Sequence, residues 1–400
     1  MVNSPLAKVI IGSKNFKRNP KKFNELIFDK FDGEVFGIED VLKILGWTNY
    51  AHKKNSIKLN TSIFINFGNT QPIDALTLSL LESITYYFTK ELGFIVKVNH
   101  NFIRKIGSSD SLHTPLIFLR KNHPDIQKFI LEYEKKRWFN YDNEFTMPVW
   151  HRVMKYSNYL NDNKYTSKLS QELYQFLGNQ TDLTHTEAYN TAETITELVE
   201  NALEHGQSNC VVSVDVTEPT FIHKNIANKK YYGLNITLIN FSETKFGDRV
   251  LKKIKNEESI FVSDDTEKND LKNNDLKTAY NNHSRQFNDR YTEDAFANLI
   301  SIQHGVSGRN RDDNNKTGGT GLTTLIKSLQ QSAQVDGCYI ISGHTGFHFK
   351  KNELGYKDGF ISLNSTGNFI NQIPSSDSLL MLKTGFPGTA YNLSFVFEHQ

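Results

Sequence analysis

The chain has 400 residues, more than one hydrophobic core usually organises, so we expect two domains. Hydrophobic residues make up 38% and charged residues 22% of the chain, a balance that excludes global disorder. A formal net charge of +2 is too balanced to indicate a nucleic-acid or membrane partner through the overall electrostatic field.

The cysteines and the start of the chain indicate a compartment. Cys210 and Cys338 are far apart and form no C-x-x-C pair, so we expect neither a zinc site nor a disulfide framework. No apolar run approaches the roughly 20 residues that a membrane helix requires. The first residues also lack the apolar core of a secretory signal. We therefore expect a cytoplasmic protein.

The first part of the chain predicts a small α/β domain over residues 1–145. An apolar run at 63–67 predicts a strand, residues 71 and 72 a turn, 74–92 a helix, and GFIVKV at 93–98 a second strand. A strand, a helix and a strand in this order predict a β-α-β unit with a parallel sheet. Pro124 and Pro148 bound a stretch without long periodicity, which predicts a connector between domains.

The second part predicts an α/β domain over residues 146–400. We expect amphipathic helices at about 149–177 and 184–205, followed by strands at 211–216 and 231–240. Residues 245–317 are strongly polar and longer than an unstructured loop normally is, so we expect a mobile functional segment there. After it we expect a glycine-rich turn, a helix at about 322–332, a strand pair in CYIISG and GFHFK, and a last strand in TAYNLSFVFE.

A polar stripe runs along the second of these helices, in TITELVENALEHG. Glu197, Asn201 and His205 recur every fourth residue and therefore share one face of the helix. An amide oxygen is a hard ligand for Mg²⁺, and a carboxylate one turn away can orient an attacking water. A solvated surface stripe is the alternative interpretation, and the stretch alone does not decide between the two.

A glycine-rich turn in TGGTGL precedes the helix at about 322–332. Gly318, Gly319 and Gly321 let the backbone approach an anion closely, and free N–H groups at a helix N-terminus attract phosphate. The stretch does not follow the G-x-x-x-x-G-K-[ST] pattern of a P-loop. On its own it is as typical of a structural turn as of a phosphate site.

Three further groups of residues are candidates of lower weight. Gly388 and Thr389 open the last strand, where the hydroxyl can contact a base. Arg309, Arg311 and Lys316 precede the glycine turn and can reach a phosphate, although solvent exposure is the alternative. His344 and His348 lie four residues apart on a predicted strand, too far for easy shared ligation, so we expect a structural role.

The order of these motifs resembles that of the GHKL ATPase superfamily of gyrase, heat-shock chaperones, histidine kinases and MutL. The order is ELVENALEHG, a strand ending at Asn240, a long polar segment, TGGTGL and a terminal G-T strand. The resemblance covers about residues 150–400 and implies a two-layer α/β sandwich that binds ATP and Mg²⁺. It implies that Asn201 holds the metal and Glu197 is the general base. It further implies cofactor contacts from the following residues: Asn201, His205, Asn240, Lys316, Gly318, Gly319, Thr320, Gly321, Leu322 and Thr389, with residues 245–317 as the lid.

One motif departs from the GHKL pattern. The family's D-x-G-x-G box, whose aspartate binds the adenine amino group, is replaced here by N-F-S-E-T starting at Asn240. An asparagine keeps a carbonyl acceptor but lacks the charge, and both glycines are absent. ATP binding is therefore expected to be weakened, altered or lost, with binding still the favoured interpretation.

The N-terminal stretch IFINFGNTQPIDALTLSLLESI resembles the strand, loop and helix at the centre of STAS domains, over residues 25–120. The family's phosphorylation motif is not clearly present, and Thr77 and Ser79 are the nearest candidates. An unrelated small α/β domain is the alternative interpretation.

These resemblances imply a nucleotide-controlled regulatory switch with slow hydrolysis or phosphotransfer, and with a protein partner. An ATPase and a serine/threonine kinase of the anti-sigma-factor type both stay open, as does a homodimer. The context of His185 lacks the usual histidine-kinase acceptor sequence, which argues against that subtype. The hypothesis from another class is a non-catalytic interaction scaffold with a degenerate nucleotide pocket.

Overall fold

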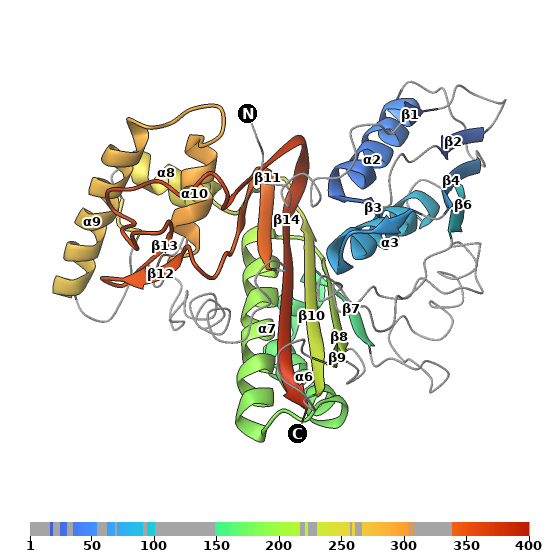
Figure 1. Ribbon diagram of the computed structural model, residues 1–400, viewed down its shortest axis with the longest axis horizontal. Coiled ribbons are helices and arrows are strands. Elements are labelled where there is room, and N and C mark those ends of the chain that lie inside the picture. The colour runs from blue at the N-terminus through green and yellow to red at the C-terminus, as the bar shows by residue number, and fades with distance from the viewer. Residues whose placement is uncertain are drawn as a thin grey trace. The chain divides into compact units, whose positions relative to one another are not determined.

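The computed structural model in Figure 1 describes most, but not all, of the chain. The residues that it describes are 17–18, 25–29, 35–53, 62–68, 70–90, 94–100, 149–216, 221–222, 230–256, 258–260, 266–303, 306 and 338–399. They combine helices and strands, so the predicted α/β class is confirmed. Within these ranges, no helix is long and apolar enough to cross a membrane.

The chain divides into two compact units, each built from more than one stretch of sequence. The first contains Met1–Arg152, Val211–Ile239 and Val396–Gln400. The second contains Val153–Cys210 and Asn240–Phe395. The predicted site residues that the structure describes, Glu197, Asn201, His205, Asn240 and Thr389, belong to the second unit.

The N-terminal part of the first unit is a parallel α/β arrangement. Its elements are β1 (Lys17–Arg18), β2 (Glu25–Asp29), β3 (Val35–Phe36), α2 (Ile38–Lys53), β4 (Ser62–Gly68), β5 (Gln71–Pro72), α3 (Ala75–Lys90) and β6 (Ile95–His100). One sheet has the order β1-β2-β4-β6, in which β2, β4 and β6 are parallel and β1 is antiparallel to β2. The predicted β-α-β unit is therefore confirmed as β4-α3-β6.

Helix α3 is buried along most of its length, including the two hydroxyls that resemble a phosphorylation site. Asp74 accepts a hydrogen bond from the backbone N–H of Thr77 at 2.7 Å, which caps the first turn. Thr77 is fully buried, and Ser79 is 1% exposed with its Oγ 3.0 Å from Oγ1 of Thr237. In this conformation neither hydroxyl is open to a kinase.

The second unit begins with a group of three helices, α5 (Tyr156–Asn161), α6 (Tyr165–Gln180) and α7 (His185–Gly206). Leu169, Leu173 and Leu177 recur every fourth residue along α6 and are buried, because α6 packs against α7. The predicted helix at 149–177 is wrong at its start, since Val149–Met154 forms strand β7. The helix predicted at 184–205 is confirmed as α7.

The remaining strands are β8 (Cys210–Val216), β9 (Phe221–Ile222), β10 (Lys230–Phe241), β11 (Tyr339–His348), β12 (Leu354–Lys357), β13 (Phe360–Leu363) and β14 (Leu379–His399). In the described ranges, a six-stranded sheet has the order β11-β14-β10-β8-β7, with β9 paired to β10. The strands predicted at 211–216 and 231–240 are confirmed. The predicted strand pair is instead the single strand β11, whose register with β14 shifts around Gly343, and the last strand starts at Leu379.

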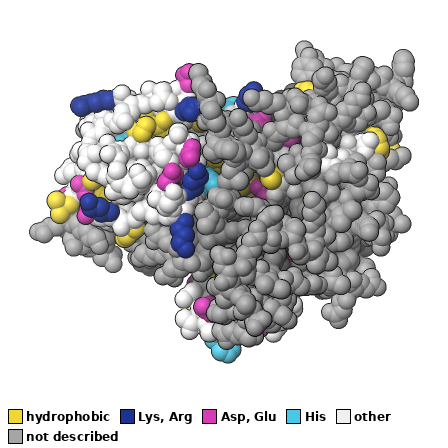
Figure 2. Space-filling model, viewed as in Figure 1, with side chains coloured by type: hydrophobic (Ala, Val, Ile, Leu, Met, Phe, Trp, Pro, Cys, Tyr) yellow, Lys and Arg dark blue, Asp and Glu magenta, His cyan; other side chains and the backbone are white. Residues whose placement is uncertain are grey.

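Most of the described part of the polar segment 245–317 is helical. It forms α8 (Asp248–Lys255), α9 (Thr266–Ser284) and α10 (Glu293–Ser301), and α10 packs against α8, α9 and β11. Basic and acidic side chains both appear on the face drawn in Figure 2, and Lys255 Nζ pairs with Glu293 Oε2 at 2.7 Å between α8 and α10. Much of the segment that was expected to be mobile is thus built of helices that pack on one another.

His283 lies at the centre of the core that holds these helices. Its Nε2 is 2.7 Å from the carbonyl of Phe369, which accepts, so its Nδ1 accepts from the Tyr291 hydroxyl at 2.6 Å. The Phe296 ring packs against the imidazole with 5.1 Å between ring centroids. Burial lowers the pKa of His283, and the imidazole is a neutral part of the core.

Candidate functional site

The helix that carries the predicted metal stripe, α7, starts at a capping box. Thr184 accepts from the backbone N–H of Glu187, whose carboxylate accepts from the backbone N–H of Thr184 at 2.9 Å. Buried residues along α7 form its apolar side, and the helix ends at Gly206, before Gln207 at a φ of 50°. These signals fix the start and the end of the helix, and with them the direction of its polar stripe.

Glu197, Asn201 and His205 are all half-buried on this helix. With a rise of about 1.5 Å per residue, the three side chains span about 12 Å along one face. Each of the three side chains is therefore partly covered by the rest of the protein. This partial burial does not by itself identify a ligand.

The turn between α7 and β8 is held by Asn240, at the end of β10. The Nδ2 of Asn240 lies 3.0 Å from Ser208 Oγ and 3.3 Å from the carbonyl oxygens of Ser208 and Asn209. Ser208 Oγ donates to the carbonyl of Phe241 at 2.6 Å and is free to accept from Asn240. The Asn240 side chain, 2% exposed, is thus a donor inside the protein.

The chain after β10 joins the end of α7 to strand β14. Ser242 Oγ donates to the carbonyl of Gly206 at 2.8 Å, and the backbone N–H of Ser242 donates to the carbonyl of Pro387 at 3.1 Å. Gly388 has a φ of +129°, and an added Cβ there would lie 2.0 Å from the carbonyl oxygen of Asn240. Glycine is required at this position because the backbones approach so closely. Three predicted motif segments, at 197–206, 240–244 and 388–389, therefore meet.

Thr389 of β14 links this cluster to Ser342 of strand β11. Its Oγ1 is 3.1 Å from Oγ of Ser342, which donates to the carbonyl of Gly388 at 2.9 Å and accepts from the backbone N–H of Phe246 at 3.0 Å. Thr389 is 8% exposed. Its hydroxyl is thus engaged between two strands.

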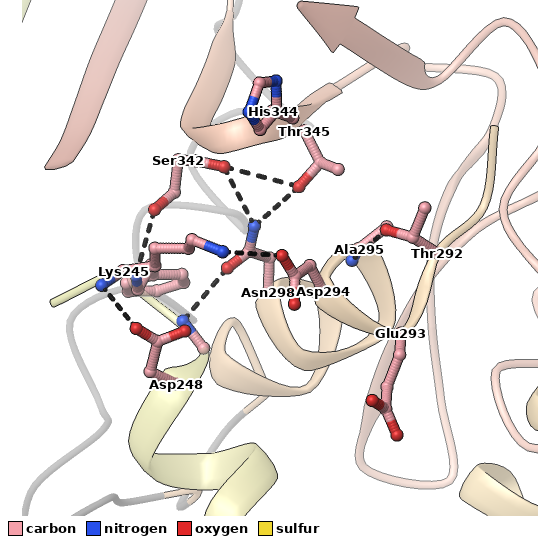
Figure 3. A network of polar contacts seen from close by, with 12 residues as sticks. Lys245, Asp248, Thr292, Glu293, Asp294, Ala295, Asn298, Ser342, His344 and Thr345 are labelled. Atoms are coloured by element: carbon pink, nitrogen blue, oxygen red, sulfur yellow. Dashed lines mark hydrogen bonds and ion pairs between the residues drawn. The ribbon is translucent and has the colours of Figure 1, made fainter. Parts of the chain in front are cut away.

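Asn298 of α10 fixes the start of the predicted lid to β11 (Figure 3). Its Oδ1 accepts from the backbone N–H of Gly247 at 3.0 Å, and its Nδ2 donates to Thr345 Oγ1 at 2.8 Å and to the carbonyl of Ser342 at 3.4 Å. The side chain is 5% exposed, so all three contacts are shielded from water. The first part of the segment 245–317 is consequently anchored.

An ion pair lies at the edge of this network. Lys245 Nζ is 2.7 Å from Asp294 Oδ2, and both side chains are more than one third exposed. The hydrogen bond to Asp294 raises the pKa of Lys245, but solvent screening makes such a pair a weak source of stability. His344 Nδ1 lies 3.1 Å from the carbonyl of Leu382, and His348 is buried.

The other predicted site residues lie outside the described part of the chain. They are Arg309, Arg311, Lys316, Gly318, Gly319, Thr320, Gly321 and Leu322. Within the described part, no group of three or more His, Cys, Asp or Glu side chains could hold a metal ion. A Mg²⁺ ion that is bound mainly by nucleotide phosphates needs only one or two protein ligands, so a single oxygen from Asn201 fits that mode of binding.

The sequence did not single out Ser208, Ser242, Asn298 or Ser342, which carry the polar network. Small hydroxyl and amide side chains of this kind follow no spacing along the chain, because their partners lie on other elements. Asn240 was singled out by its position at the end of a predicted strand, where the GHKL pattern has its aspartate. Comparisons of the chain with protein-family models, curated proteins and solved structures found no match.

Proposed function

We propose that the chain is a cytoplasmic regulatory protein that binds ATP with Mg²⁺ in a domain of the GHKL type, preceded by a STAS-like α/β domain. The observation that carries the proposal is the meeting of three motif segments that are far apart in sequence. Ser242 bonds both Gly206, at the end of α7, and Pro387, beside Gly388. The predicted order of motifs thus corresponds to neighbouring positions in space.

The proposed roles follow the chemistry of the residues. Asn201 supplies an oxygen to Mg²⁺, and Glu197 orients a water one helical turn away. Mg²⁺, when bound, supplies the positive charge that neutralises the phosphate oxygens. Gly318, Gly319 and Gly321 would offer backbone N–H groups to the phosphates.

Nucleotide binding would act as a switch. Closure of the predicted lid over the nucleotide would change the surface offered to a protein partner. Since Thr77 and Ser79 are buried, a kinase activity of the anti-sigma-factor type would act on a partner in trans.

A non-catalytic scaffold is the second candidate, and one observation favours it. Asn240 and Thr389, the two residues expected at the base, both bond within the protein. In this alternative, titration of the chain with Mg-ATP gives no heat, and ATP does not protect the predicted lid, residues 245–317, from protease.

The metal assignment is tested by calorimetric titration of Asn201→Ala. We expect its affinity for Mg-ATP to fall about tenfold or more, and its affinity for ATP in EDTA to stay unchanged. Asn190→Ala is a matched control, because Asn190 is exposed on the same helix. An Asn201→Ala protein that binds Mg-ATP as tightly as the parent contradicts the assignment.

Hydrolysis is tested with Glu197→Ala under the same conditions. If Glu197 orients the water, phosphate release falls about 10²-fold or more while binding persists. Unchanged phosphate release removes Glu197 from the role of base and leaves binding as the function.

A further inference from the structure

Strand β10 has two sides of different chemistry. Leu234, Ile236 and Leu238 form an apolar row along one side. Asn235 and Thr237 alternate with them and form a polar row on the other side. A sheet in which one face packs on a core and the other face meets water has this pattern. In the structure, however, Asn235 is 2% and Thr237 is 1% exposed, so the polar row of β10 is covered.

The neighbouring strand β8 has the same alternation. Val212 and Val214 are apolar, and Ser213 and Asp215 alternate with them. These two polar side chains are 2% and 3% exposed. Two adjacent strands thus carry buried polar side chains at positions where the pattern predicts a surface in contact with water.

Helix α3 forms part of this cover. Ser79 Oγ lies 3.0 Å from Thr237 Oγ1, and both residues belong to the first unit. Ser83 lies one helical turn further along α3, and its Oγ donates to the carbonyl of Ser79 at 2.7 Å. Ser79 is 1% and Ser83 9% exposed. The contact that joins α3 to β10 through Ser79 and Thr237 is therefore polar.

A polar contact of this kind exchanges readily with water. When Ser79 and Thr237 separate, each hydroxyl forms hydrogen bonds with water in place of the lost one, so the net loss is small. Exposing the apolar rows of β8 and β10 would cost far more, because apolar surface would enter water. Contacts between domains of one chain are in general more polar than a core, and motion between the domains is the default expectation.

We propose that α3 docks reversibly on the polar row of β10, so that the N-terminal α/β part of the first unit, β1 to β6, releases this face of the sheet while both sides stay folded. The inference does not depend on nucleotide binding. In the docked state the chain's own helix hides the polar row. In the released state Ser79 and Thr237 meet water together. The contact is a conformational device that conceals and reveals one face of the sheet.

The test is thiol labelling of the full chain carrying Ser79→Cys. Cys210 and Cys338 are fully buried, so they report openings that expose the apolar core. Each labelling rate is divided by the rate of the same thiol in the urea-unfolded chain, which removes differences in thiol reactivity. We expect the thiol at position 79 to be labelled about tenfold or more faster than Cys210 and Cys338, because local opening is more frequent than global unfolding. Equal normalised rates would overturn the proposal.

Two further variants separate release of the docked part from unfolding of α3. Thr237→Cys places the thiol on the strand, and its normalised rate should match that of Ser79→Cys because release exposes both sides together. Val96→Cys, at a fully buried position of β6, should be labelled as slowly as Cys210. Fast labelling at position 96, or at 79 without 237, would indicate local unfolding and overturn the proposal. If Ser79→Cys does not fold, Thr237→Cys carries the same test.

Discussion

Replacing Asn240 by aspartate isolates the donor role of this side chain. The two residues have the same shape, but the carboxylate cannot donate to Ser208 or Asn209. The Nδ2 group has two hydrogens shared among three acceptors, so two net hydrogen bonds are lost, each contributing about 1 kcal/mol. Buried acceptors left without a donor add to this loss. We expect Asn240→Asp to lower the free energy of unfolding by about 3 kcal/mol.

The assay is urea unfolding of the parent, Asn240→Asp and Asn274→Asp, with the slope m compared among them. Asn274 is exposed on α9, so its replacement should change the free energy of unfolding by less than about 0.5 kcal/mol. Burial raises the pKa of the introduced carboxyl above its value in the unfolded chain. The deficit should therefore be full at neutral pH and shrink as pH falls through the folded pKa. An Asn240→Asp protein as stable as Asn274→Asp would refute the donor role.

Three further predictions test the packing around the site. Gly388→Ala places a Cβ 2.0 Å from a backbone oxygen, whereas the Cβ added by Gly367→Ala meets nothing within 4 Å. In the same urea assay, Gly367→Ala should lower the free energy of unfolding by roughly 1 kcal/mol, and Gly388→Ala should lower it several times as much. Because burial lowers the pKa of His283 in the folded protein, this histidine is protonated at a higher pH in the unfolded chain than in the folded one. Stability should thus fall as pH drops below about 6.5, and His283→Gln should flatten that slope. Asn298→Ala, which removes a buried amide, should lower the free energy of unfolding by about 3 kcal/mol. Lys245→Met, which removes an exposed ion pair, should lower it by less than about 1 kcal/mol. Equal losses in the two variants would contradict the idea that burial makes the Asn298 hydrogen bonds the stronger ones.

The fold was most predictable where one periodicity ran without interruption. The strand β4, the helix α3 and the strand β6 follow from their apolar spacing, and α7 from its amphipathic spacing and polar stripe. Prediction failed at 149–154, where the run VWHRVM forms a strand with Trp150 and His151 buried, because so short a run also fits the start of the next helix. It also failed for α9, whose polar sequence has few apolar residues to mark a helix.

The site was less predictable than the fold. Sequence spacing placed Glu197, Asn201 and His205 on one helix face, and motif order indicated that Asn240 and Thr389 lie near one another. The direction of each side chain was beyond reach, because it depends on partners such as Ser208 and Ser342 that come from other elements. The sequence does not distinguish an asparagine whose amide donates inside the protein from one whose amide accepts from a ligand.

Binding of a nucleotide through its phosphates and a metal is the claim on which the account depends. Calorimetric titration of the full chain with ATP, in Mg²⁺ and then in EDTA, measures it most directly. We predict saturable binding in Mg²⁺ that is weakened about tenfold or more when the metal is removed. Absence of binding in both conditions, or identical affinities in both, would contradict the account.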